Sequence, residues 1–155
     1  MLRFVSNSPD DTRDFAKKIA SKLSGGDVIA FTGTLGAGKT EFTKGIAAAF
    51  GYPGTVYSPT FAIINEYVSP ESKFPIYHFD MYRISGFDSL YSTGFFDFLD
   101  SGAVLVVEWS ENISEYPPEN TIFIDITRDF DNIDSAPDKR IITLKGDGRF
   151  DDIGY

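Results

Sequence analysis

The segment GTLGAGKT at residues 33–40 constrains this chain more than any other feature. It matches the pattern G-x-x-x-x-G-K-[ST] without a gap, and this pattern surrounds a phosphate chain with backbone N–H groups, a helix N-terminus and a lysine. The apolar run DVIAFT at residues 27–32 predicts a buried parallel strand before it. A helix is predicted from residue 38 or 39 to about residue 50, since apolar residues recur there on one face and Gly51 and Pro53 follow. The strand, the glycine loop and the helix are therefore contiguous, as a phosphate-binding loop requires.

The residues of this loop predict how a nucleotide would be held. The glycines let the backbone approach the phosphates, Lys39 can reach the β and γ oxygens, and the hydroxyl of Thr40 can ligate Mg²⁺. A chance glycine-rich turn is the alternative, but average residue usage makes such a match expected on the order of 1% of the time in a chain of this length. ATP and Mg²⁺ are the predicted cofactors. The predicted nucleotide-binding residues are Gly33, Leu35, Gly36, Ala37, Gly38, Lys39, Thr40, Glu41 and Thr60.

Two acids could complete a hydrolytic site. Glu108 ends the apolar run AVLVVE, and Asp80 ends the run IYHFD. Acids that face bound phosphates normally lie at the carboxyl ends of sheet strands, where they ligate Mg²⁺ or orient the attacking water. Either acid could do either job, and a solvated strand end is the alternative for each. The predicted catalytic residues are Asp80, Glu108 and Lys39, and the predicted metal ligands are Thr40, Glu108 and Asp80.

Three other side chains could belong to the site. Thr60 lies in GTVYSPT, where a loop that orders around the γ-phosphate would be placed, although Ser and Thr beside Pro are also ordinary turn residues. His78 is the only histidine and lies near Asp80, but a lone histidine in an apolar strand is more often structural, so no catalytic role is assigned to it. Trp109 could stack on a base or a partner, yet packing at the core margin is the favoured interpretation.

The rest of the chain predicts an α/β protein. Ser8 is the predicted N-cap of a first helix that Gly25 and Gly26 would end. Residues 61–68 and 74–80 predict an antiparallel hairpin around the turn SPESK. Further strands are predicted at residues 2–6, 103–109, 121–127 and 140–145, and one or two short helices over residues 86–100. The predicted fold class is an α/β P-loop NTPase with a central mixed, mostly parallel sheet flanked by helices and an antiparallel hairpin, in a single domain.

The composition excludes some classes of function. A net charge of −9 disfavours direct binding of nucleic acid, which depends largely on Lys and Arg. An acidic surface could attract a basic partner, but solubility is the simpler reason for the charge. The absence of cysteine excludes disulfides and thiolate metal sites and favours a reducing cytoplasm. The sequence predicts neither a signal peptide nor a membrane span.

Segments outside the loop resemble one family. They are SPTF at residues 58–61, HFDMYR at residues 78–83 and VEW at residues 107–109. In this order after the phosphate loop, they resemble the TsaE family, bacterial ATPases that assist the formation of threonylcarbamoyladenosine in tRNA. The resemblance covers about residues 10–111, and the C-terminal region adds little to it.

The resemblance implies an activity, partners and residue roles. A TsaE protein joins the proteins TsaB and TsaD and hydrolyses ATP with Mg²⁺ to reset that complex between rounds, so tRNA would be met only through the complex. By motif position, the residues with implied roles are Lys39 and Thr40 as phosphate and Mg²⁺ ligands, Thr60 as the SPTF threonine, Asp80 and Glu108 as active-site acids, and Trp109 as a flanking aromatic.

The chain departs from the family pattern at three positions. Thr34 stands where an acid is common, Glu41 where a small hydroxyl residue usually follows the loop threonine, and Ser110 where proline is common. A carboxylate in the first turn of a helix suits the helix dipole, but near an α-phosphate it should repel. Glu41 therefore predicts weaker nucleotide affinity, and Glu41→Thr is expected to tighten ATP binding.

A small-molecule kinase is the main alternative, since many P-loop kinases have this size. Such enzymes clamp the transferred phosphoryl group with arginines, whereas Lys73 and Arg83 are the only basic residues between Gly45 and Thr127. A GTPase is disfavoured because the chain contains no Asn-Lys pair to begin the guanine-reading motif N-K-x-D. A module that binds its partners with negligible turnover is the third interpretation.

Overall fold

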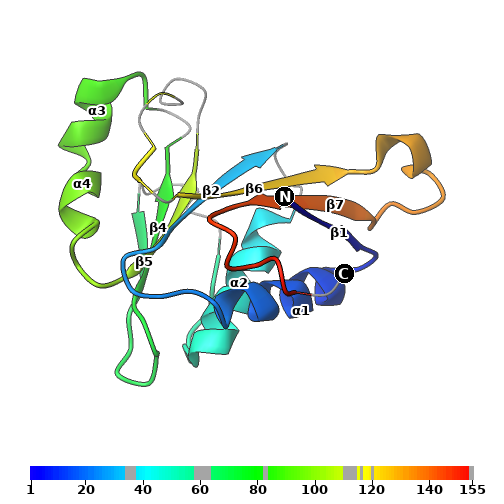
Figure 1. Ribbon diagram of the computed structural model, residues 1–155, viewed down its shortest axis with the longest axis horizontal. Coiled ribbons are helices and arrows are strands. Elements are labelled where there is room, and N and C mark those ends of the chain that lie inside the picture. The colour runs from blue at the N-terminus through cyan, green and yellow to red at the C-terminus, as the bar shows by residue number, and fades with distance from the viewer. Residues whose placement is uncertain are drawn as a thin grey trace.

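One sheet of seven strands organises the chain (Figure 1). The computed structural model describes residues 1–33, 38–57, 64–81, 84–109, 115, 117–119 and 121–153. In space the strands are ordered β1-β7-β6-β2-β5-β4-β3. Their bounds are β1 Leu2–Ser6, β2 Val28–Gly33, β3 Ile64–Tyr67, β4 Ile76–Asp80, β5 Val104–Glu108, β6 Ile122–Arg128 and β7 Arg140–Lys145.

The centre of the sheet is parallel and both margins are antiparallel. Strands β6, β2, β5 and β4 run parallel to one another, whereas β3 pairs antiparallel with β4. At the other margin, β7 lies antiparallel between β6 and β1. The predicted fold class is confirmed, including the hairpin of β3 and β4. The first strand in the sequence, β1, forms a further antiparallel pair with the last strand, β7. The carboxyl ends of the four parallel strands therefore meet at one edge of the sheet.

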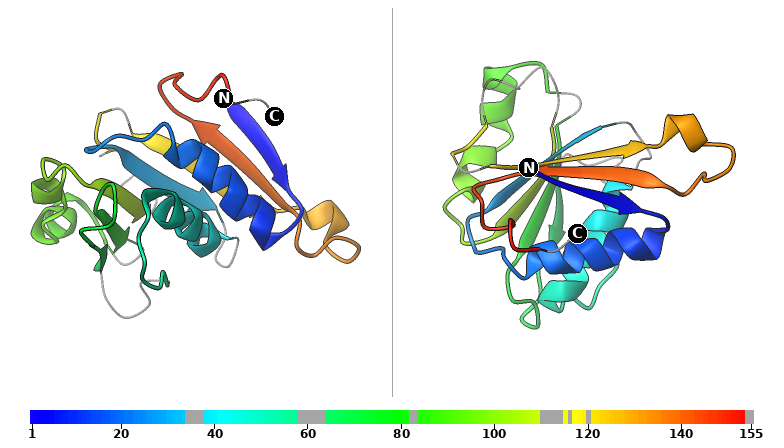
Figure 2. Two further views of the ribbon diagram at one scale, coloured as in Figure 1. Left: turned by 90° about the horizontal axis from the view of Figure 1, so that it is seen from below. Right: turned by 45° about the vertical axis from the view of Figure 1, so that its right-hand side comes forward.

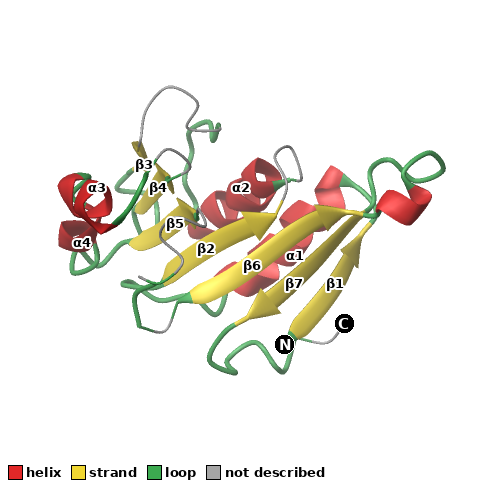
Figure 3. Ribbon diagram, turned by 90° about the horizontal axis from the view of Figure 1, so that it is seen from above, coloured by secondary structure: helices red, strands yellow, loops and turns green. Residues whose placement is uncertain are grey.

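Helices α1 (Pro9–Ala20) and α2 (Lys39–Phe50) cover one face of the sheet (Figures 2 and 3). Phe15 of α1 and Phe42 of α2 pack together edge to face, and Phe42 also packs on Phe31 of β2. These rings belong to the larger of two buried apolar clusters. The apolar face predicted for α2 and the apolar face of α1 are thus the surfaces that build this layer.

The ends of α1 show one prediction confirmed and one wrong. Ser8 is the N-cap, and its hydroxyl accepts a hydrogen bond of 3.1 Å from the N–H of Asp11. The helix ends at Ala20, before the predicted stop at Gly25. The N–H groups of the next residues bond three residues back, Leu23 to the carbonyl of Ala20 for example, so the chain leaves the helix through tight turns while Leu23 stays buried.

Helices α3 (Phe87–Ser92) and α4 (Phe95–Phe98) lie on the other face, beside β4 and β5 (Figure 1). Leu90 and Phe95 pack there with Phe79 of β4 and with Leu105 and Val107 of β5. The prediction of short helices between residues 86 and 100 is confirmed. A 3-10 helix, η2 (Phe130–Asn132), lies between β6 and β7. Among the described residues, no helix has the length and apolar character needed to cross a membrane.

Candidate nucleotide-binding site

Gly33 and Gly38 stand on either side of the part of the loop that lies outside the described residues. Their φ angles are 108° and 114°, a region that other residues rarely adopt. A Cβ at Gly33 would also lie 2.2 Å from the carbonyl oxygen of Ile126 in β6. Glycine is therefore required at Gly33 for its conformation and for the close approach of β6. The predicted residues Leu35, Gly36 and Ala37 lie outside the described part of the chain, as does Thr34.

Lys39 is the first residue of α2 and is buried, with 8% of its surface exposed. Its Nζ donates a hydrogen bond of 3.2 Å to the carbonyl oxygen of Gly33, so the amino group is directed back toward the end of β2. Thr40 follows in the same turn and is half-buried. A lysine at the N-terminus of a 12-residue helix creates a region that favours an anion.

Asp80 and Glu108 lie directly opposite each other in the parallel register of β4 and β5. Because side chains alternate along a strand, both point to the same face as Val106, which is packed in the cluster beneath α1 and α2. Burial raises the pKa of Glu108, the charge of Asp80 raises it further, and the charge of Lys39 lowers it. The structure thus brings the three predicted catalytic residues close enough to act on one another electrostatically.

His78 lies against this group, although the sequence assigned no catalytic role to it. Its side chain is fully buried, and its Nε2 lies 3.8 Å from Oε2 of Glu108. Burial lowers the pKa of His78 to about 4, so the ring is neutral at pH 7. The sequence could have predicted that His78 and Asp80 share one face of a strand, because they are two residues apart. It could not have predicted that His78 lies near Glu108, because this depends on the pairing of β4 with β5, which no local pattern reveals.

Glu41 in the first turn of α2 is held by two cationic side chains. Arg13 of α1 donates to its Oε2, and Nζ of Lys44 lies 3.1 Å from its Oε1. Burial would raise the pKa of Glu41, but the hydrogen bonds from Lys44 and Arg13 outweigh burial and hold the pKa below its usual range. The expectation that Glu41 repels a nucleotide did not include these two counter-charges, and its effect on affinity stays a prediction.

Trp109 follows Glu108 but belongs to the opposite face. It is 8% exposed and packs in the cluster beneath α3 and α4, with its ring 6.3 Å from that of Phe95. The packing interpretation is confirmed, and the side chain lies across the sheet from Lys39. Thr60 and Arg83 lie outside the described residues.

The side chains gathered here fit ATP with Mg²⁺. Mg²⁺ prefers oxygen ligands and takes one or two carboxylates while substrate phosphates and water supply the rest. Asp80, Glu108 and the hydroxyl of Thr40 carry oxygens that could serve as such ligands. In the described ranges, no group of three or more His, Asp or Glu side chains is arranged to hold a metal ion by itself.

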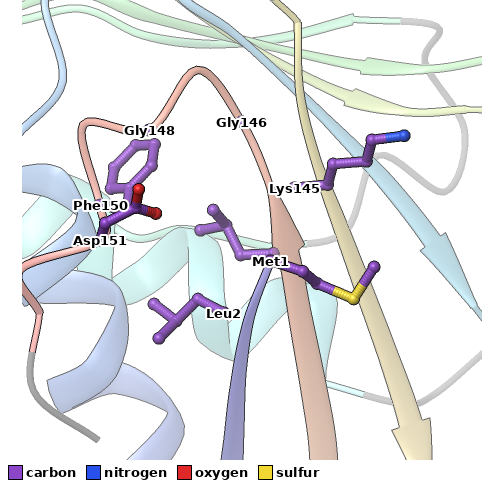
Figure 4. Close-up of a pocket in the computed structure, with 8 residues that line it drawn as sticks. Met1, Leu2, Lys145, Gly146, Gly148, Phe150 and Asp151 are labelled. Carbon is purple, nitrogen blue, oxygen red and sulfur yellow. The ribbon is translucent and has the colours of Figure 1, made fainter.

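A hollow of about 160 Å³ lies elsewhere, between the start of β1 and the turn after β7 (Figure 4). Leu2, Leu144 and Phe150 line it together with the backbone of Gly146 and Gly148. Since β7 runs antiparallel to β6, the end of β7 lies at the amino end of β6, opposite the sheet edge that carries Asp80 and Glu108. This hollow is therefore separate from the candidate site.

A buried parallel strand, a glycine loop that leads into a helical lysine, and two acids at the ends of neighbouring strands define an α/β protein of the P-loop class. Within that class the chain belongs to the TsaE family, because the family model described as "Threonylcarbamoyl adenosine biosynthesis protein TsaE" matches residues 6–141.

Curated relatives and a solved structure agree with this membership. The tRNA threonylcarbamoyladenosine biosynthesis protein TsaE of Bacillus subtilis (strain 168) is 37% identical over 147 residues, 95% of this chain and 87% of the relative. The protein of the same name from Rickettsia prowazekii (strain Madrid E) is 43% identical over 69% of this chain and 73% of the relative. The crystal structure of Bacillus subtilis YdiB superposes with a TM-score of 0.73 at 34% identity, over 97% of this chain and 88% of that one.

Proposed function

We propose that this chain binds ATP with Mg²⁺ and hydrolyses the ATP to support threonylcarbamoyladenosine modification of tRNA. The observation that carries the proposal is the opposed pair Asp80 and Glu108, which share one sheet face, with Glu108 interacting electrostatically with Lys39 of the phosphate loop. Water-positioning and metal-binding acids occupy this place relative to the phosphates in P-loop hydrolases.

Each residue has a distinct task in this proposal. Lys39 exchanges the carbonyl of Gly33 for the β and γ oxygens of ATP, and the N-terminus of α2 adds backbone N–H groups. Thr40 and one of the two acids hold Mg²⁺, which neutralises charge on the phosphates when it is bound. The other acid orients the attacking water. The raised pKa of Glu108 reflects burial and the neighbouring charge of Asp80, an arrangement that a bound cation would relieve.

The proposed partners are TsaB and TsaD, and tRNA is met only through their complex. The names of the curated relatives support a place in tRNA threonylcarbamoyladenosine biosynthesis. The net charge of −9 supports indirect contact with tRNA, because a protein that grasps RNA by itself needs positive charge to neutralise phosphates.

The decisive experiment measures phosphate release from ATP with and without purified TsaB and TsaD. The wild-type chain is expected to hydrolyse ATP slowly alone and faster with both partners. Lys39→Ala is expected to weaken ATP binding about tenfold to a hundredfold, the loss of a hydrogen bond to a charged group. Asp80→Asn and Glu108→Gln are each expected to lower kcat by about 10² to 10⁴ while ATP still binds.

Two controls match these variants in chemistry. Lys145→Ala removes an exposed lysine from β7, and Asp88→Asn removes an exposed acid from α3, and both are expected to keep wild-type turnover. An absence of stimulation by TsaB and TsaD, together with phosphoryl transfer to a metabolite, would overturn the proposal in favour of a kinase.

A further inference from the structure

His78 has a fully buried polar side chain that makes no hydrogen bond to any of the described residues. It lies in the middle of β4, and neither Nδ1 nor Nε2 has a hydrogen-bond partner in the described part of the chain. Burying an unpartnered polar group costs free energy, and an apolar residue of similar size would avoid that cost. A purely structural role therefore explains this histidine poorly.

The ring is directed toward one functional side chain. Nε2 of His78 lies 3.8 Å from Oε2 of Glu108, while the ring of Tyr67 packs 6.3 Å away on the side of β3. In the sheet register, His78 lies opposite Val106 and Asp80 lies opposite Glu108, so His78 approaches Glu108 diagonally from beneath. The distance exceeds that of a hydrogen bond by less than 1 Å. A small rotation of the Glu108 side chain would close it.

The chemistry of the two side chains decides which of them donates. His78 is fully buried on the same sheet face as Asp80 and Glu108. A neutral imidazole carries one N–H, and the nitrogen without the proton can only accept. Because a carboxylate can only accept, the nitrogen that faces Glu108 must be the one that carries the proton.

We propose that His78 is a positioning residue that donates its Nε2–H to Oε2 of Glu108 and so fixes the orientation of that carboxylate. The inference rests on the proposed function, in which Glu108 holds Mg²⁺ or orients water. With Oε2 held from beneath by the ring, Oε1 is the oxygen presented to the nucleotide. Such supporting hydrogen bonds commonly contribute 10-fold to 100-fold to metal affinity or activity.

Nuclear magnetic resonance tests the hydrogen bond without any nucleotide. Since His78 is the only histidine, the ring signals of a ¹⁵N-labelled chain need no assignment by mutation. The expected spectrum is that of a neutral ring with the proton on Nε2, and Glu108→Gln is expected to shift the Nε2 signal. Asp88→Asn, on the far side of the sheet, is the matched control and should leave the ring signals unchanged. A proton on Nδ1, or ring signals that do not shift in the Glu108→Gln variant, would overturn the proposal.

Turnover measurements test the consequence. His78→Met removes the donor and keeps an apolar side chain of similar length, whereas His78→Gln keeps an N–H near the position of Nε2. We expect His78→Met to lower kcat about 10-fold to 100-fold with little change in KM for ATP, and His78→Gln to restore most of the loss. A His78→Met variant with wild-type kcat would contradict a positioning role, as would equal losses in both variants.

The two experiments separate this inference from the proposed function. If the wild-type chain shows no ATPase activity with TsaB and TsaD, the proposed function fails, while the resonance experiment still reports whether the ring donates to Glu108. If hydrolysis is present but the ring carries its proton on Nδ1, the inference fails alone. The melting temperature of each variant identifies a loss of kcat that comes from unfolding.

Discussion

At the scale of single residues, the expected effect of Glu41 on a nucleotide depends on the side chains around it. In the sequence it is an acid next to a phosphate loop, and repulsion is the obvious expectation. In the structure its carboxylate joins α2 to α1 through Arg13 and also pairs with Lys44 of its own helix. Arg13 also pairs with Asp10, so this group has two cations and two anions, and as a whole it carries no net negative charge to oppose an anion. What Glu41 does is reduce the positive charge that Arg13 and Lys44 would otherwise present.

The variant Glu41→Thr is therefore expected to tighten ATP binding, as the sequence predicted, for a more specific reason. Removing the carboxylate leaves Lys44 uncompensated near the N-terminus of α2, while Arg13 keeps its ion pair with Asp10. The gain should be about threefold to tenfold in Kd, or about 1 kcal/mol. Titration calorimetry with ATP and Mg²⁺ measures it. Glu71→Thr, an exposed acid in the turn between β3 and β4, is the control that should not change Kd. Unchanged or weaker binding by Glu41→Thr would remove this explanation.

At the scale of elements, the contact between α1 and α2 depends on Gly45. A Cβ at this position would lie 2.5 Å from the carbonyl oxygen of Arg13 and 2.6 Å from Cβ of Ala16. The two helices therefore approach each other almost backbone to backbone, in the layer that covers the sheet beside the candidate site. In the sequence, Gly45 is only a weak point in an otherwise good helix. The close approach of α1 explains why it is tolerated.

The variant Gly45→Ala measures this contact. Alanine favours a helix by about 1 kcal/mol over glycine, but the backbone of α1 cannot move aside cheaply, so we expect a net loss of about 1–3 kcal/mol in the free energy of unfolding. Denaturant unfolding gives that value. Gly86→Ala is the control, because a Cβ at Gly86 meets nothing within 4 Å and its φ of 173° is extended backbone. A stabilised Gly45→Ala variant would show that helix propensity outweighs the contact.

At the scale of the whole molecule, the segment after β7 packs back against the core and forms ion pairs with residues near the start of β2. Arg149 Nη1 lies 2.5 Å from Oδ2 of Asp27, just before β2, and Lys22 Nζ lies 2.7 Å from Oδ1 of Asp152. Phe150 is 2% exposed and packs in the cluster beneath α1 and α2. The composition of GDGRFDDIGY is that of a loop, and it does not by itself predict these contacts. The structure shows that this loop joins the C-terminal region to the segment that leads into the phosphate loop.

Truncation of Phe150 tests this packing. We expect Phe150→Ala to lower the free energy of unfolding by about 3–5 kcal/mol, the usual cost of removing a buried aromatic ring. Phe130→Ala, which removes a ring that is 61% exposed, should change it little. Thermal and denaturant unfolding of both variants measure the difference, and equal stabilities would show that the C-terminal segment contributes nothing to the core.

The fold was largely predictable because its signals are local. The strand at residues 27–32, the glycine loop and the following helix are read from apolar runs and glycine positions within about 20 residues. The hairpin of β3 and β4 depends on a short turn, and the N-cap at Ser8 on a spacing of three residues. The end of α1 was wrong because apolar periodicity continues to Leu23 through turns that only the hydrogen bonds reveal.

By itself, the sequence determined the phosphate loop, the class of fold and the identity of Asp80 and Glu108 as candidate acids, since each depends on residues close together in the chain. Only the tertiary structure decided that these acids are opposed across β4 and β5, that His78 lies beneath them and that Glu41 is compensated. Each of these facts needs the pairing of elements separated by 28 residues or more, as Asp80 and Glu108 or Arg13 and Glu41 are. Such pairing is set by the packing of the whole chain, and no local pattern contains it.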